Sequence, residues 1–284
     1  MAFNYQELKN LKTEALIDDT INSTNIGDGE VHTAKINSGT MTSAKFASGS
    51  VNTSSGTVTG TLPVTKGGTG LTSVGGNNTV LTTNNSGNGL AYANTGLRSM
   101  QVFTGGGTWN KPSGVRYIHV QVTGAGGGGS GHGESGGAGG YAEEIINVSN
   151  VSSVSVSIGN AGGGTYYANR AGNSNGSSFG NYCSASGGRG ANRNNQHSGG
   201  LPGIGSGGNL NSYGGGGGSH HQSYGPGGRS FWGGSSASGH PQGGNFAHNH
   251  QSHAAYGCGG QGGYFHGIRG ANGRNGLVVI TEYY

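Results

Sequence analysis

The sequence predicts a mostly β, elongated, trimeric fibre with a short N-terminal helix, a β-rich shaft and a C-terminal antiparallel β framework that carries a glycine-rich insert of polyproline II type. Three observations lead to this fold class. Residues 124–276 contain 49 glycines among 153 residues. Short β-like pieces alternate with Gly/Ser turns over residues 21–65, and stretches of alternating apolar residues lie on both sides of the glycine-rich part.

The glycine-rich stretch has too few Val, Ile and Leu side chains for an ordinary hydrophobic core, and glycine loses the most backbone entropy on ordering. It is therefore either a disordered tail or a region where missing Cβ atoms let backbones pack closely, as in collagen. Collagen itself is excluded, because glycine is not at every third position and the chain has five prolines. The spacers are rich in aromatic residues and histidine, unlike flexible Gly/Ser linkers. This composition favours rows of extended helices joined by loops.

Three regions follow from these patterns. Residues 1–20 have the only helical periodicity and are predicted to be an attachment segment, with a helical cap as the alternative. Residues 21–97 are predicted to be the shaft and linker, because residues 34–36 (AKI) return ten positions later as 44–46 (AKF). One such chain has too few apolar residues to close its own core, whereas several identical chains around one axis give each apolar residue a partner. Residues 98–284 are predicted to be a C-terminal domain.

Four stretches of the C-terminal domain are strand candidates because they are rich in β-branched residues and partly alternate between apolar and polar. They are residues 115–122, 141–148, 151–158 and 277–283. We expect them to form a small antiparallel framework. The first and last of them are expected to lie side by side and to hold both ends of the glycine-rich insert.

The composition gives expectations for binding partners, for membrane insertion and for the state of the cysteines. Residues 98–284 carry nine Lys/Arg and four Asp/Glu, a net charge of +5, which suits anionic partners or only confers solubility. No apolar run approaches the length of a membrane span, so no membrane insertion is expected. The two cysteines, Cys183 and Cys258, are expected to be free thiols.

Two stretches of sequence resemble a known family. Residues 62–72 (LPVTKGGTGLT) closely resemble a segment that recurs in bacteriophage tail fibres. Residues 102–115 and then 120–129 are similar to the glycine-rich domain at the ends of many phage fibres, and residues 276–284 fit the final strand of that family. Together these matches cover residues 62–284.

The resemblance implies a structural virion protein of the tail fibre, built as a homotrimer and attached by its N-terminus to the phage tail or baseplate. Some phage tip adhesins stack glycine-rich polyproline II-type helices into a sandwich, and this chain is similar in composition and rhythm. The loops of the C-terminal domain would then recognise a receptor on the bacterial surface. That receptor would be a glycan such as lipopolysaccharide, or an outer-membrane protein.

The aromatic residues and histidines between the glycine runs are the candidate receptor contacts. Loops on a rigid scaffold often carry recognition, and Tyr, Trp, Ser, Gly and Asn suit binding surfaces. The candidates are Tyr166, Tyr167, His220, His221, Tyr224, Phe231, Trp232 and Phe265. The alternative is that some aromatic residues, especially Phe179, Phe246 and Trp232, close the edges of the glycine array as its hydrophobic core.

Histidines gather late in the chain, with eight of the eleven in residues 197–266. On an extended chain, His248 and His250 point to the same side and would suit a transition-metal ion. Zinc sites normally add Cys or carboxylates, and carboxylates are missing here, so a polar loop is the alternative. No other cofactor is expected.

Three rival functions fit the sequence less well. A glycan depolymerase needs a pair of carboxylates, but the only acids after residue 97 are Glu134, Glu143, Glu144 and Glu282, and the adjacent Glu143 and Glu144 of a strand point to opposite faces. We therefore expect no enzyme. Nucleic-acid binding is not expected either, because the arginines are scattered. A non-viral glycine-rich structural protein remains the third alternative, against which the shaft-like repeat and the tail-fibre strings argue.

Overall fold

A computed structural model describes residues 68–71, 75–77, 79–84, 86–166, 170–192, 198–219, 225–234, 254–263 and 269–284. The chain forms two compact units, Met1–Thr72 and Ser73–Tyr284. The predicted N-terminal helix and residues 21–67 of the predicted shaft lie outside the described residues. All the strands among the described residues belong to the second unit.

The described part of the chain is mostly β and contains no helix, as predicted for the C-terminal domain. All strand pairs are antiparallel, in one two-stranded sheet (β1-β2) and two five-stranded sheets (β10-β9-β8-β7-β4 and β11-β6-β5-β12-β3). The strands are β1 (Thr79–Thr83), β2 (Leu90–Asn94), β3 (Leu97–Phe103), β4 (Gly107–Asn110), β5 (Tyr117–Thr123), β6 (Tyr141–Asn147), β7 (Ser153–Ser157), β8 (Ser177–Phe179), β9 (Cys183–Ala185), β10 (Gly205–Ser206), β11 (Leu210–Ser212) and β12 (Leu277–Tyr283).

The last strand, β12, lies between β3 and β5. Its Ile280 is opposite Val120 of β5 and Gln101 of β3. The predicted pairing of the first and last strand candidates is therefore confirmed. Because β5 leads into the glycine-rich part and β12 follows it, this pairing ties together the two ends of that part.

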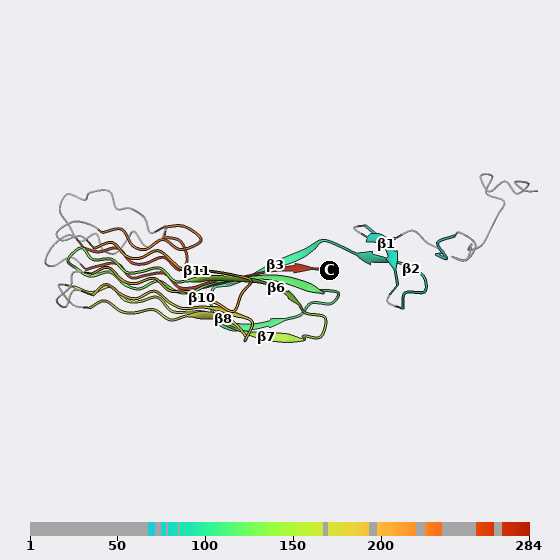
Figure 1. The fold of residues 1–284 in the computed structure, drawn as a ribbon, viewed down its shortest axis with the longest axis horizontal. Coiled ribbons are helices and arrows are strands. Elements are labelled where there is room, and N and C mark those ends of the chain that lie inside the picture. Colours follow the sequence, from blue (N-terminus) through green and yellow to red (C-terminus); the bar gives the residue numbers. More distant parts are fainter. Residues whose placement is uncertain are drawn as a thin grey trace, which may run out of the picture. The chain divides into compact units, whose positions relative to one another are not determined.

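The two five-stranded sheets pack against each other around one hydrophobic core (Figure 1). The predicted alternation of β5 is confirmed, since Ile118, Val120 and Val122 are buried while His119 and Gln121 are half-buried. From the opposing sheet, Trp109 and Phe179 meet edge-on with ring centroids 5.9 Å apart. Phe179, which the sequence offered as a core residue, is fully buried here. The other core members include Val115, Ala142, Ile146, Val148, Val154, Val156, Cys183, Ala185, Val278 and Ile280.

Cys183 and Cys258 are free, buried thiols, as expected from the sequence. Burial raises the pKa of Cys183 to about 12 and that of Cys258 to about 11. Since the thiolate is the reactive form, we predict that neither thiol reacts with a disulfide reagent near neutral pH in the folded protein, and that both react after denaturation. Colorimetric thiol titration with and without denaturant measures this. Rapid labelling of either cysteine in the native protein would contradict it.

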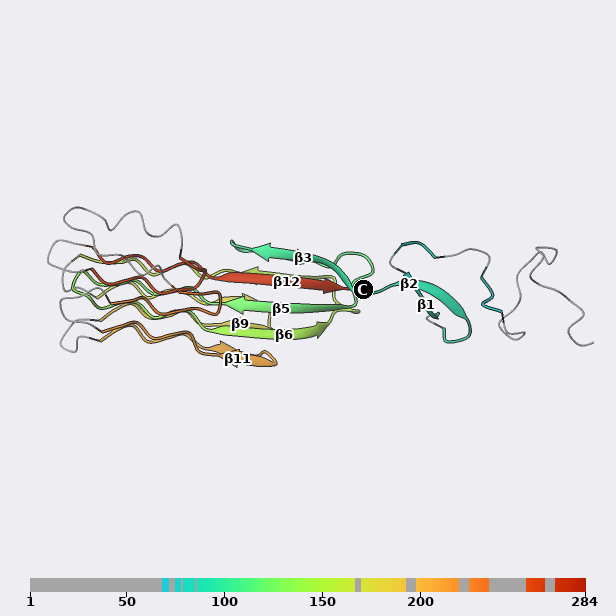
Figure 2. The same cartoon turned by 90° about the horizontal axis from the view of Figure 1, so that it is seen from above.

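Among the described residues, ten glycine-rich segments run side by side from the strands to the opposite end of the domain (Figures 1 and 2). They are hydrogen-bonded to one another through their backbones rather than as regular strands. The segments, each named by its residue numbers, are 124–130, 134–140, 159–165, 170–176, 186–192, 198–204, 213–219, 225–230, 257–263 and 269–276.

The hydrogen bonds of segment 124–130 repeat every three residues. Three consecutive N–H groups donate to carbonyl groups of three different segments, and the fourth N–H group donates to the same segment as the first. These bonds run from Gly126 to the Arg274 oxygen, from Gly127 to Gly137, from Gly128 to Gly172 and from Gly129 to Ala271. The carbonyl groups of the same segment accept from three further segments, through the N–H groups of Gly162, Gly188 and Gly260. Segment 124–130 therefore has six hydrogen-bonded neighbours.

Segment 134–140 is surrounded in the same way, and we call these two the central segments. The hydrogen bonds order the ten segments as three layers. The layers are 170–176, 186–192 and 198–204; then 159–165, 124–130, 134–140 and 213–219; then 269–276, 257–263 and 225–230. Because nearly all backbone N–H and C=O groups of the central segments bond to a neighbouring segment, these polar groups are satisfied without water.

Glycine is required where the central segments touch their neighbours. A Cβ atom built on Gly126, Gly127 or Gly136 would come closer than 3.0 Å to backbone atoms of an adjacent segment. No side-chain rearrangement relieves a contact with backbone, so the segments would have to separate. Close approach of backbones thus replaces side-chain packing in this part of the domain.

Candidate functional site

The glycine segments end together at the side of the domain away from the strands, which we call the distal end (Figure 2). Hydrogen bonds between neighbouring segments identify the residues at this level. The Thr165 N–H donates to Gly129, the Gly263 N–H donates to Ser130, and Asn192 pairs with Ser198. Successive connections between segments start and finish at this end, so residues far apart in the sequence come together there.

The turn between the two central segments lies at the centre of the distal end. The Ser130 hydroxyl donates to the Glu134 carboxylate at 2.5 Å, and both side chains are fully buried. The Ser135 hydroxyl donates to the Gly225 carbonyl and accepts from the Gly262 N–H at 3.0 Å. These side-chain bonds join the turn to segments 225–230 and 257–263. The turn is therefore a fixed base for the residues that surround it.

Tyr166 is the predicted contact residue that the described structure places at the distal end. Its side chain is 47% exposed. The Arg269 guanidinium carbon lies 6.0 Å from the Tyr166 ring centroid, a cation–π geometry, and Arg269 Nε donates to the Gly164 carbonyl at 3.0 Å. This arrangement presents an aromatic face and a positive charge together.

Phe231 and Trp232 lie at the other end of the glycine segments, beside the start of β6. The Phe231 ring stacks on the Tyr141 ring with centroids 3.7 Å apart, and Phe231 remains 52% exposed. Trp232 is half-buried, and its Nε1 donates to Thr123 Oγ1 at 2.7 Å. The structure therefore does not bring these two residues near Tyr166. Their contacts tie segment 225–230 to the framework.

The remaining candidate contacts, Tyr167, His220, His221, Tyr224 and Phe265, lie outside the described residues, as does Phe246. The same holds for the metal candidates His248 and His250. Among the residues that the structure describes, no cluster of three His, Cys, Asp or Glu side chains could hold a metal ion. The metal prediction at the histidine pair stays a prediction.

A polar network on the outer face of the β5–β6 pair was not predicted from the sequence. The Tyr141 hydroxyl donates to the Glu143 carboxylate at 2.5 Å and accepts from Gln121 Nε2 at 2.7 Å, while His119 Nε2 lies 3.3 Å from Glu143. Burial raises the pKa of Tyr141, and the hydrogen bond from Tyr141 lowers the pKa of Glu143. The strand register, once known, places these residues together, because alternate residues of paired strands share one face.

Acid is expected to destabilise the protein through Glu143. Its folded-state pKa is below the ordinary value of 4.5, so its stabilising contribution is full above the unfolded-state pKa and is lost as the pH falls through the folded-state pKa. We predict that the unfolding free energy of the native protein falls more steeply below about pH 4.5 than that of Glu143→Gln. Denaturant unfolding across the acid range measures both slopes, and equal slopes would contradict the prediction.

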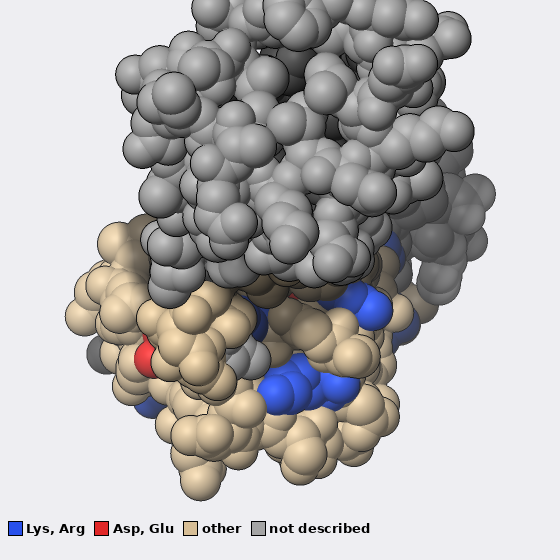
Figure 3. Space-filling view, turned by 90° about the vertical axis from the view of Figure 1, so that its right-hand side faces the viewer, with Lys and Arg blue, Asp and Glu red and all other residues tan. Residues whose placement is uncertain are grey.

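The surface charge is mainly positive. On the face seen in Figure 3, Lys and Arg side chains cover more of the described surface than Asp and Glu. Two of the four carboxylates after residue 97, Glu134 and Glu282, are fully buried. The described surface therefore favours anionic over cationic partners.

Comparison with known proteins supports a family assignment. No helix among the described residues is long and apolar enough to cross a membrane. No curated protein matches the chain. A family model described as "Glycine-rich domain" matches residues 101–283, which spans β4 to β12 and all ten glycine segments. The chain therefore belongs to the glycine-rich domain family.

Proposed function

We propose that the protein is a bacteriophage tail fibre that binds a host surface receptor through the distal end of its glycine-rich domain. The observation that carries the proposal is the convergence of the chain on that end, where Tyr166 and Arg269 present an aromatic ring beside a cation. Convergent loops on a rigid scaffold are suited to recognition. The strings at residues 62–72, 102–115 and 120–129, which resemble phage fibre sequences, support the same assignment.

The glycine segments would be polyproline II-type helices. Their backbone bonds repeat every three residues, and polyproline II has three residues per turn with no internal hydrogen bonds. A helix of this kind directs its N–H and C=O groups outward in turn, which suits a segment with six neighbours. Such an array is rigid, so the distal residues would be preorganised for binding.

The protein would act as a homotrimer in the virion, with residues 1–20 attached to the tail or baseplate and residues 21–97 forming a shaft. Several tips on one particle would raise the avidity far above the affinity of one tip. The receptor would be a bacterial glycan such as lipopolysaccharide, or an outer-membrane protein.

Recognition without catalysis is the expected activity. The described carboxylates support this, because Glu134 and Glu282 are buried, and Glu143 and Glu144 occupy successive positions of β6 and so point to opposite faces. A glycosidase of the usual kind needs two carboxylates facing one bond. Incubation of the protein with host surface polysaccharide should therefore release no reducing ends.

The proposal is tested by solution mass and cell binding of the full chain. Light scattering should give a mass of about three times 28.2 kDa, and labelled protein should bind host cells saturably. A monomer that binds no bacterial strain of a broad panel would contradict the proposal.

Substitution of Tyr166 is expected to weaken cell binding. Tyr166→Ala should lower the affinity roughly tenfold or more, because exposed aromatic residues at the centre of an interface often dominate binding. Tyr213→Ala is the matched control, since Tyr213 is 69% exposed but adjoins the framework, where its backbone pairs with Ile204. Fluorescence binding to cells measures both variants. Equal losses in the two variants, or no loss in either, would exclude Tyr166 as a contact.

A further inference from the structure

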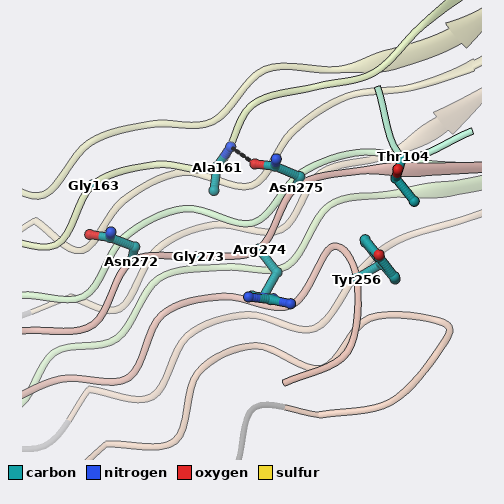
Figure 4. A pocket seen from close by; sticks show the side chains of 8 residues that line it. All are labelled: Thr104, Ala161, Gly163, Tyr256, Asn272, Gly273, Arg274 and Asn275. Carbon is teal, nitrogen blue, oxygen red and sulfur yellow. Dashed lines mark hydrogen bonds between the residues drawn. The ribbon is translucent and has the colours of Figure 1, made fainter. Parts of the chain in front are cut away.

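A groove of about 470 Å³ opens on the side of the domain between the end of β3, the start of β12 and the outer glycine segments. Its wall is formed by segments 159–165 and 269–276, with Thr104 and Tyr256 closing the side nearer the strands (Figure 4). This groove is separate from the distal end, because Thr104 directly follows β3. Its polar lining consists of side chains whose hydrogen-bonding groups are only partly used.

Two asparagines of the groove are held in defined orientations. Asn275 Oδ1 accepts from the Ala161 N–H at 2.9 Å, and Asn272 Oδ1 accepts from the Gly164 N–H at 2.8 Å. The two asparagines are three residues apart, and so are the two N–H groups that donate to them. Both side-chain oxygens therefore accept from segment 159–165 in the same way, one repeat apart. Because each oxygen is engaged, each amide nitrogen remains as a donor, and neither has a hydrogen-bond partner among the described residues.

Arg274 supplies the charge of the groove. Its side chain is half-buried and has neither an ion pair nor a hydrogen bond within the described part of the chain. The sequence has no Asp or Glu between residues 145 and 281, so no nearby segment supplies a counter-charge from this stretch. A guanidinium has five N–H donors in a planar fork that matches a carboxylate or a phosphate.

Tyr256 supplies an aromatic surface next to this charge. Its side chain is 36% exposed, and its ring and the Arg274 guanidinium lie on neighbouring parts of the wall (Figure 4). Its hydroxyl makes no hydrogen bond with any other described residue. An open aromatic face beside directed polar groups is the usual composition of a site that orients a small polar ligand with an apolar face.

We propose that this groove binds an anionic sugar, meaning a pyranose that carries a carboxylate or a phosphate. Arg274 pairs with the anionic group, the amide nitrogens of Asn272 and Asn275 donate to ring hydroxyls, and Tyr256 covers the apolar face of the ring. The inference concerns a site apart from the distal end, and it does not depend on the assignment to a phage fibre.

Calorimetric titration of the full-length protein tests the proposal with four probes: sodium glucuronate, glucose 6-phosphate, glucose and inorganic phosphate. We expect saturable binding of glucuronate, glucose 6-phosphate or both, and about tenfold weaker binding of glucose and of inorganic phosphate. The two anionic sugars distinguish a carboxylate ligand from a phosphate ligand. Added salt should weaken the binding, since the ion pair is partly exposed.

Two variants assign the binding to the groove. Arg274→Gln should weaken binding of the anionic sugar about tenfold, whereas Arg189→Gln, the same change at an exposed arginine of segment 186–192, should leave it unchanged. Tyr256→Leu should weaken binding of the sugars but not binding of inorganic phosphate. Three outcomes would overturn the proposal: no saturable binding of either anionic sugar, equal losses in the two arginine variants, or inorganic phosphate bound as tightly as glucose 6-phosphate.

Discussion

Gly127→Ala is expected to destabilise the protein severely, although it adds only one methyl group. The new Cβ would lie within 3.0 Å of the Arg189 carbonyl and the Gly190 nitrogen. These are backbone atoms of a segment that is itself hydrogen-bonded on both sides, so relief requires the layers to separate. We expect a loss of about 4 kcal/mol or more in the free energy of unfolding, at the upper end of single-substitution effects.

The control for this prediction is Gly216→Ala in segment 213–219. There the nearest atom to an added Cβ is the Gly200 oxygen at 3.9 Å, an ordinary contact. This change should alter the unfolding free energy by no more than about 0.5 kcal/mol, or stabilise slightly by restricting the unfolded chain. Thermal and denaturant unfolding measure both variants. Similar losses at the two positions would show that close backbone approach is not what excludes a side chain at Gly127.

Glu282→Ala is the second substitution with a large expected effect. The Glu282 carboxylate is fully buried and accepts from Trp109 Nε1 at 2.8 Å and from Gln101 Nε2 at 2.7 Å, with the Ser99 hydroxyl as a further donor. Arg98 lies 3.4 Å away as its ionic partner. Removal of the carboxylate leaves the buried Trp109 N–H of β4 and the half-buried donors of β3 without their acceptor, which should cost about 3–5 kcal/mol of unfolding free energy.

Two further variants separate the causes of this loss. Thr281→Ala, one position earlier on β12 and half-buried, has no side-chain hydrogen bond among the described residues and should cost little. Glu282→Gln keeps the volume of the side chain but turns one acceptor into a donor. Its loss of unfolding free energy should therefore fall between those of Glu282→Ala and Thr281→Ala. A loss for Glu282→Ala no greater than that for Thr281→Ala would mean that the carboxylate does not hold β3, β4 and β12 together.

The framework strands were predictable because their side chains carry the signal. Alternating or β-branched residues predicted β5, β6, β7 and β12, and the structure confirms each of them. Strands β1 to β4 and β8 to β11 were not predicted as strands. Strands β8 to β11 are two or three residues long and lie within the glycine-rich part, and Ser177–Phe179 or Gly205–Ser206 is too short to show a period.

The candidate site was predictable only in part. The sequence identified Tyr166 and Phe231 by the same criterion, as aromatic residues between glycine runs, but the structure places them at opposite ends of the segments. The groove at Arg274 was not predicted at all. Its residues come from the end of β3, from segment 159–165 and from the last part of the chain, and no local pattern connects them.

The sequence by itself determined that a β framework encloses the glycine-rich part, and it favoured close backbone packing over disorder there, because periodicity and the absence of Cβ atoms are properties of the residues. Only the tertiary structure decided which segments are neighbours. The bonds that order the three layers join backbone N–H to backbone C=O. Every residue except proline carries both of these groups, so the sequence does not indicate which segment a given backbone group bonds to.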